Sequence, residues 1–379
     1  MHPKSFPGPG ACADPAGTDQ DGSVAAQQLP PSSALGGLGV PHLRRLWSSA
    51  MAARYGHAGQ RAGESLLDRL VLDALGLGLH QTWDYLLHEA PAFEAFEAWI
   101  VATAGRPDER SVQRLRTLIA DAPRMRAVDG WLEAIETAPP VLDAADLEQW
   151  AEHGYVVLAD AITPEEREAA AEAILRHVGA MPDEPESWYR YGGRHGIMVE
   201  LIQHAALDAV RRSPRVHKAF AQLWGTADLW ASADRCGFHP PQRPGYPFPG
   251  PDLHWDMDFG EPLRFGTQGI LYLTDTPANQ GALTVVPGFH RRLPDWLAAL
   301  APGVDPQQQD LHALGPRPIA GKAGDLVIWH QWLPHGASPN AGMHPRIVQY
   351  VNLMAGAAAV PRSADAGAGS VVSIECSTT

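Results

Sequence analysis

The sequence is poor in cysteine and in positive charge. Its 379 residues include three cysteines, Cys12, Cys236 and Cys376, which lie far apart without CxxC spacing, and this argues against a disulfide framework and a thiolate metal site. The 29 Lys and Arg residues are outnumbered by 43 Asp and Glu residues, and no basic run occurs. A formal net charge of -14 argues against a nucleic-acid partner or an anionic membrane surface. We therefore expect a protein of the reducing cytoplasm with a small-molecule substrate.

Long apolar stretches are also missing. No window approaches 18 uninterrupted apolar residues, and the N-terminus lacks a charged segment followed by an apolar one. We therefore expect neither a membrane span nor a secretory signal.

Composition divides the chain into segments. Residues 1–38 are rich in Pro, Gly, Ala and Ser and nearly free of aromatic side chains, which predicts a disordered tail. Apolar residues recur at three- and four-residue steps from Leu66 to Leu75 and again near residue 96, which predicts an accessory helical region at 41–138. This region is also the candidate surface for a homodimer. Residues 355–379, rich in Ala, Gly and Ser, are predicted to be a flexible C-terminal tail.

Residues 143–354 form the predicted catalytic domain. Helices are expected at 143–153, 164–179 and 206–224, and most of the strands follow them. The strand-like runs, separated by Gly and Pro, lie at 155–160, 198–203, 228–238, 268–274, 282–287, 325–329 and 346–354. Helices followed by short strands favour a mainly β fold with helices (α+β), a jelly-roll sandwich, over a parallel doubly wound sheet.

One His-x-Asp pair is the main candidate for chemistry. Two histidines and a carboxylate can occupy three positions of an octahedral Fe(II) and leave three for a bidentate cosubstrate and O2. Because residues two apart in a strand face the same side, LHWDMDFG supplies His254 and Asp256, and WLPHGASPN supplies His335 from a later strand. Chance alone gives about two such spacings in a chain of this composition, so the pair is weak by itself. A surface-loop pair is the competing explanation.

Other polar residues compete with this triad. Asp258 lies on the same face of the extended segment as Asp256, and we interpret it as a hydrogen-bond partner of substrate or ligand. His330 falls within a predicted strand end, His344 in a Pro/Gly turn and His290 after a Pro-Gly turn. We interpret these three histidines as structural.

Arginines are the candidate anion ligands. Arg346 opens the last predicted strand, where its guanidinium can form two hydrogen bonds with the distal carboxylate of 2-oxoglutarate, and a surface charge is the alternative. Arg235 is flanked by strand residues, where an unpaired charge is costly, so it either meets a carboxylate ligand or pairs with an internal acid. With Arg190 and Arg194 of SWYRYGGRHG, it hints at a substrate that carries a carboxylate.

Five blocks occur in order along the chain: YVVLADAITPEE at 155–166, HWD, NQGALTVVPGFH at 279–290, GDLVIWHQWLPHGASPN at 324–340 and Arg346. Together they resemble the phytanoyl-CoA dioxygenase family of Fe(II)/2-oxoglutarate oxygenases. The resemblance implies a double-stranded β-helix (cupin-like) core, with iron bound by His254, Asp256 and His335 and 2-oxoglutarate anchored by Arg346. It also implies that four further residues line the cosubstrate pocket: Arg235, Trp255, Gln268 and Ile270.

Three positions bear on the function that the resemblance implies. Phe289 replaces the small hydroxyl residue of a PGSH motif, and Ala337 lies two residues after the distal histidine, so a hydroxyl contact to 2-oxoglutarate is missing or comes from Ser338. Asp256 fills the position that halogenases of this chemistry leave for chloride, which disfavours halogenation. No basic patch suits a CoA phosphate.

The expected activity is that of a non-haem iron dioxygenase. It would hydroxylate a C–H bond of a small-molecule metabolite while 2-oxoglutarate and O2 are converted to succinate and CO2. Three alternatives stay open. They are a metal-dependent isomerase or hydrolase on the same barrel, a non-catalytic binding protein, and an interaction module built on residues 41–138.

Overall fold

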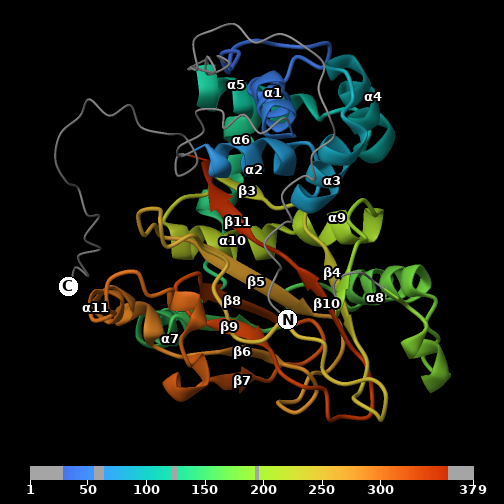
Figure 1. Cartoon of the computed structure of the whole chain (residues 1–379), viewed down its shortest axis with the longest axis vertical. Coiled ribbons are helices and arrows are strands. Elements are labelled where there is room, and N and C mark those ends of the chain that lie inside the picture. The colour runs from blue at the N-terminus through green and yellow to red at the C-terminus, as the bar shows by residue number, and fades with distance from the viewer. Residues whose placement is uncertain (1–28, 55–63, 121–125, 193–195, 357–379) are drawn as a thin grey trace, which may run out of the picture.

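The computed structural model describes residues 29–54, 64–120, 126–192 and 196–356 (Figure 1). Most of the two predicted tails, 1–38 and 355–379, lies outside the described residues, as does Arg194.

Among the described residues, six helices form the N-terminal region at the top of Figure 1. They are α1 (Leu43–Arg54), α2 (Ser65–Ala74), α3 (Leu79–Glu89), α4 (Phe93–Ala104), α5 (Glu109–Ala120) and α6 (Arg126–Thr137). The apolar segment 64–88 forms two helices because the chain turns at Gly76, whose positive φ of 69° suits glycine. Leucine and phenylalanine side chains of α1 to α5 pack into a core of their own, which also includes Trp230.

Two antiparallel sheets form the rest of the core. The larger has the order β1-β8-β5-β10-β4-β2 and the smaller the order β7-β6-β9. The larger sheet contains β1 (Tyr155–Leu158), β2 (Met198–Val199), β4 (Cys236–His239), β5 (Thr267–Tyr272), β8 (Leu326–His330) and β10 (Arg346–Tyr350). The smaller contains β6 (Leu283–Val285), β7 (Arg317–Ile319) and β9 (His335–Ala337). Apolar side chains of both sheets, such as Ile270, Val327 and Leu283, share one buried cluster, as expected for a jelly roll.

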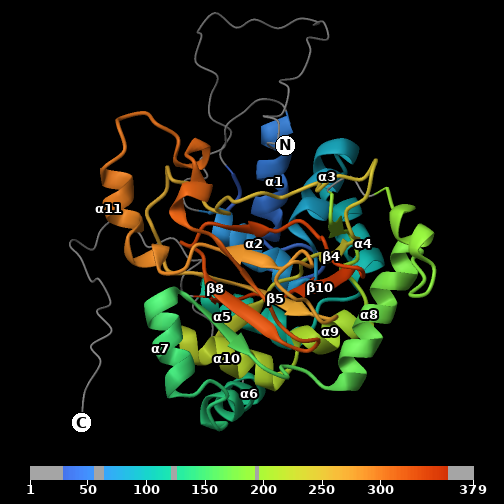
Figure 2. The same ribbon diagram turned by 90° about the horizontal axis from the view of Figure 1, so that it is seen from below.

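Helices cover the other face of the larger sheet, as Figure 2 shows from below. They are α7 (Ala144–His153), α8 (Pro164–Val178), α9 (Ala205–Arg211) and α10 (Pro214–Trp224). The helix expected at 206–224 is divided because Ser213 caps the second half and Pro214 occupies its first turn, where proline needs no amide donor. Beside the smaller sheet lie α11 (Leu293–Ala298) and 3-10 helices at Phe289–Arg291, Pro306–Gln308 and Leu311–Leu314, and a further one lies at Pro185–Tyr189.

A third, two-stranded sheet joins the two regions. It pairs β3 (Leu229–Ala231) with β11 (Leu353–Ala355), which follows directly on β10, and Trp230 of β3 enters the core of the helical region. The predicted fold class, mainly β with helices and a jelly-roll core, is confirmed. None of the helices described here has the length and apolar character that crossing a membrane requires.

Candidate active site

The predicted triad converges at one point of the structure. Side-chain donor atoms of His254, Asp256 and His335 all lie within 4.8 Å of one another. The backbones of His254 and His335 exchange two hydrogen bonds of 2.9 Å, which brings the segment before Asp256 alongside β9. Among the described residues, no second group of His, Cys, Asp or Glu meets the same spacing.

Backbone carbonyls fix the orientation of both imidazoles. His254 Nδ1 lies 2.6 Å from the carbonyl oxygen of Asp252, and His335 Nδ1 lies 3.1 Å from that of Leu333. Because a carbonyl oxygen only accepts, each Nδ1 carries a proton, and each Nε2 faces the carboxylate of Asp256 at 3.4 Å. Metal-binding histidines are commonly held in this way.

Gln268 holds the carboxylate between them. Its Nε2 donates to Asp256 Oδ2 at 2.7 Å, and its Oε1 accepts from the indole N–H of Trp329 at 3.1 Å. The indole can only donate, so the amide orientation of Gln268 is determined and its Nε2 must face Asp256. Both Gln268 and Trp329 come from neighbouring strands of the larger sheet, β5 and β8.

Electrostatics favour a positive charge at the centre of the triad. Burial raises the pKa of Asp256, but hydrogen bonds and charges of His254 and His335 hold it well below its ordinary range. Burial lowers the pKa of His254, whereas the hydrogen bond and charge of Asp256 outweigh this and raise it. The two imidazoles and the carboxylate therefore draw positive charge to one point, where a divalent cation would compete with protons for the Nε2 atoms. Two Nε2 atoms and a carboxylate suit Fe(II) with open positions.

Arg346 fits a dicarboxylate cosubstrate. It lies in β10 with 1% of its surface exposed, and its Nη1 donates to the carbonyl oxygen of Gly281 at 2.7 Å. Within the described part of the chain, its Nε and Nη2 have no acceptor at ordinary hydrogen-bond distance, and the phenol of Tyr350 is the polar side chain beside its guanidinium. Buried guanidinium donors without partners are costly, and a carboxylate is the group that would satisfy both at once.

Of the remaining pocket residues expected from the resemblance, three line the cavity and one faces away from it. Ile270 and Gln268 line the same cavity as the triad, as does Arg235. Trp255 faces the opposite way, because it lies between His254 and Asp256 and successive side chains of an extended segment alternate. Its ring is buried against Phe259, Phe289 and Trp296, and its indole donates to the carbonyl oxygen of Trp332.

The two positions that depart from the family motif have different surroundings. Phe289 is buried in this aromatic cluster, where it contacts Trp255 and Trp296. Ala337 lines the cavity without a hydroxyl, and the hydroxyl of Ser338 donates to the carbonyl oxygen of Ala282.

The rival residues lie outside the triad. Asp258 lines the cavity and accepts a hydrogen bond from the backbone of Gly260. His330 is packed among Trp150, Phe265 and Trp332, and burial lowers its pKa to about 3. It is therefore a neutral core residue, in agreement with the structural role inferred from its position.

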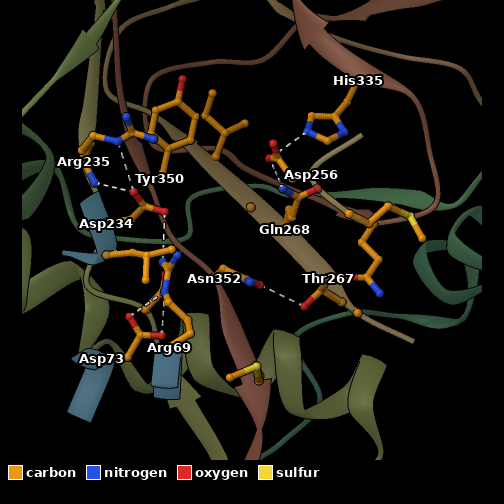
Figure 3. A pocket seen from close by; sticks show the side chains of 18 of the residues that line it. Arg69, Asp73, Asp234, Arg235, Asp256, Thr267, Gln268, His335, Tyr350 and Asn352 are labelled. Carbon is orange, nitrogen blue, oxygen red and sulfur yellow. Dashed lines mark hydrogen bonds and ion pairs between the residues drawn. The ribbon is translucent and has the colours of Figure 1, made fainter. Parts of the chain in front are cut away.

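One cavity of about 780 Å³ connects these residues, a size within the roughly 300–1,000 Å³ common for small-molecule sites. Figure 3 shows His335, Asp256 and Gln268 on one side and Arg235, Asp234, Arg69 and Asp73 on the other. Arg69 and Asp73 come from α2. Sequence reasoning missed both, because they meet Asp234 and its neighbours across more than 150 positions of chain and no local pattern signals such a contact.

The model of the phytanoyl-CoA dioxygenase family matches residues 150–348, more than half of the chain. The chain belongs to this family. The match spans the triad and Arg346 and begins after the helical region ends at Thr137.

Curated relatives are distant. A putative phytanoyl-CoA dioxygenase of Dictyostelium discoideum is 24% identical over 38% of this chain and 52% of its own length. An ectoine dioxygenase of Bordetella parapertussis is 26% identical over 54% of this chain and 73% of its own length. The chain therefore spans about half of the first of these relatives. Among solved structures, AviO1 from Streptomyces viridochromogenes has 19% identity and a TM-score of 0.42, over 60% of this chain and all of that one.

Proposed function

We propose that this member of the family is an Fe(II)- and 2-oxoglutarate-dependent oxygenase that hydroxylates a C–H bond of a small-molecule metabolite. The observation that carries the proposal is a cavity with two oriented Nε2 atoms and a carboxylate at one place and a buried arginine with two unpartnered donors at another. His254, Asp256 and His335 would hold the iron. Arg346 would bind the distal carboxylate of 2-oxoglutarate.

The iron, 2-oxoglutarate and O2 would together supply the oxidising power and yield succinate and CO2. The side chains of this protein orient the metal ligands and exclude water from the site. Carbonyls of Asp252 and Leu333 keep the imidazole lone pairs directed at the metal position, and Gln268 holds the carboxylate there. Apolar side chains such as Ile270 and Leu283 line the neighbouring wall and keep water away from the reacting C–H bond.

The order of residues along the larger sheet separates two subsites. Arg346 and Tyr350 both face the cavity from β10, four residues apart, which corresponds to about 13 Å along a strand. Tyr350 lies opposite Ile270, two residues from Gln268 and its partner Asp256. The cosubstrate would therefore extend from the triad towards Arg346, and the primary substrate would occupy the other direction, towards α2.

A metal-dependent isomerase or hydrolase would use the same triad and would leave the unpartnered donors of Arg346 unexplained. No observation favours this alternative over the oxygenase. A homodimer through residues 41–138 and a cytoplasmic location stay predictions, and light scattering of the purified protein tests the first.

Release of succinate from 2-oxoglutarate tests the proposal. We expect the purified chain to form succinate only with both Fe(II) and O2, and the variants His254→Ala and His335→Ala to lose this activity. His177→Ala, which removes an exposed histidine of α8, is the matched control and should behave as the wild type. Wild-type succinate formation by His254→Ala would refute the ligand assignment.

A further inference from the structure

Helix α2 reaches from the helical region into the cavity through a chain of ion pairs. Arg69 contacts Asp73 through Nε at 3.1 Å and 3.2 Å, and its Nη2 lies 3.3 Å from Asp234 Oδ2. Asp73 also accepts the backbone N–H of Ala233 at 2.9 Å. The loop between β3 and β4 is thus attached to α2 at two points.

Arg235 is the last residue in this series of ion pairs. Its backbone N–H donates to Asp234 Oδ1 at 2.7 Å, and its Nε lies 3.6 Å from the same oxygen, beyond ordinary hydrogen-bond distance. Over the part of the molecule that the structure describes, the two terminal nitrogens of Arg235 make no hydrogen bond, although only 20% of the side chain is exposed. A guanidinium fork therefore faces the cavity with its donors available (Figure 3).

The position of this fork sets it apart from the cosubstrate subsite. The amide N–H of Tyr350 contacts the carbonyl oxygen of Arg235, and Tyr350 lies opposite Ile270, so the three residues form one row across β4, β10 and β5. Two strand spacings, about 10 Å, separate Arg235 from the β5 side of the cavity, where Gln268 contacts Asp256. A small molecule bound by Arg235 can place another part of its body at the triad.

The part of the cavity between α2 and this row is lined by polar side chains of α2 and α3 together with several large apolar ones. Leu66 of α2, Leu79 of α3, Trp230 of β3, Met354 of β11 and Trp224 of α10 line it. We propose that Arg235 binds the carboxylate of the primary substrate, a monocarboxylic acid with an apolar body, and that α2 positions this arginine through Asp73, Arg69 and Asp234. This inference rests on the proposed function. It assigns Arg235 to the primary substrate in place of the cosubstrate role implied by the resemblance, and it gives the helical region, which lies outside the family match, a part in recognition.

Paired neutral and charged probes test the proposal in the full chain loaded with Fe(II) and 2-oxoglutarate without O2. We expect calorimetry to show that phenylacetate binds about tenfold or more tightly than phenylacetamide, as a charge-assisted pair of hydrogen bonds requires. Arg235→Met should abolish this preference and change the affinity for 2-oxoglutarate less than twofold. Arg176→Met, which removes an exposed arginine of α8, is the matched control and should keep the preference.

The role of Arg69 has its own readout. Arg69→Met should lower the preference for phenylacetate over phenylacetamide without changing the affinity for 2-oxoglutarate, and Arg69→Lys should restore part of the preference. If Arg69→Met does not fold, the ratio measured for Arg69→Lys, expected between those of the wild type and Arg235→Met, decides the point.

Three results would overturn the inference: no phenylacetate binding by the wild type, equal binding of the two probes, or a tenfold loss of 2-oxoglutarate affinity in Arg235→Met with the preference kept. Each of these leaves the proposed function intact. Failure of 2-oxoglutarate itself to bind the iron-loaded wild type would instead contradict the proposed function.

Discussion

Replacement of Arg346 by methionine separates cosubstrate binding from folding. Methionine keeps the length of the buried side chain and removes the guanidinium, whose Nε and Nη2 lack partners in the described structure and whose Nη1 donates to Gly281. Two hydrogen bonds between charged groups contribute roughly 3–6 kcal/mol, so the affinity for 2-oxoglutarate should fall about 10²- to 10⁴-fold. Arg346→Lys keeps the charge and loses the two-pronged geometry, and should lie between the two.

Calorimetric titration of 2-oxoglutarate into the iron-loaded protein without O2 measures this loss. Thermal unfolding of the ligand-free protein is the companion measurement. The carbonyl of Gly281 loses its donor, but two unsatisfied buried donors disappear, so the free energy of unfolding should change by less than about 1 kcal/mol. Unchanged 2-oxoglutarate affinity in Arg346→Met would refute the anchor. A collapse of the ligand-free fold would show that this arginine has a structural role.

Three further predictions concern the surroundings of the site. Gln268→Leu frees the carboxylate of Asp256 and should weaken Fe(II) binding roughly 10- to 100-fold, and an unchanged metal titration would exclude a supporting role. Burial lowers the pKa of His239 to about 3. Below pH 6.5 the unfolded state therefore binds more protons than the folded state, and the free energy of unfolding decreases as the pH is lowered. Between pH 7 and pH 5, His239→Phe should therefore lose about 2 kcal/mol less unfolding free energy than the wild type, as measured by urea unfolding. An identical pH dependence of the two proteins would contradict this. Gly281→Ala should lower the free energy of unfolding more than Gly225→Ala does. Both glycines have positive φ, but a Cβ at Gly281 clashes with His239 Nδ1, whereas one at Gly225 meets no atom within 4 Å. Equal shifts in unfolding temperature would be inconsistent with this contact.

Local patterns predicted the elements that local chemistry determines. The strand expected at 155–160 and the helix expected at 164–179 are both present, as Tyr155–Leu158 and Pro164–Val178, and the Thr163 hydroxyl caps the start of the helix. The strand expected at 198–203 is reduced to Met198–Val199, because it pairs with β4 over two residues only. Where a strand ends depends on its neighbour in the sheet, which the sequence does not display.

The site was predictable to the extent that its residues lie at a recognisable spacing along the sequence. His254 and Asp256 are two residues apart, and a later histidine after a strand completes the group. The same alternation places Trp255 in the core, so the cosubstrate-pocket role that the resemblance implied for it does not agree with the cavity lining. The ion pairs of Arg69 depend on the docking of α2 against the β3–β4 loop and could not be inferred from spacing.

The central claim is that two imidazoles and one carboxylate bind ferrous iron beside a subsite for 2-oxoglutarate. Anaerobic titration with Fe(II), followed by the visible charge-transfer absorption that appears when 2-oxoglutarate chelates the metal, tests it most directly. The wild type should bind one Fe(II) per chain and develop the band, and His335→Ala and Asp256→Ala should not. Full development of the band in both variants, at wild-type affinity, would contradict the account.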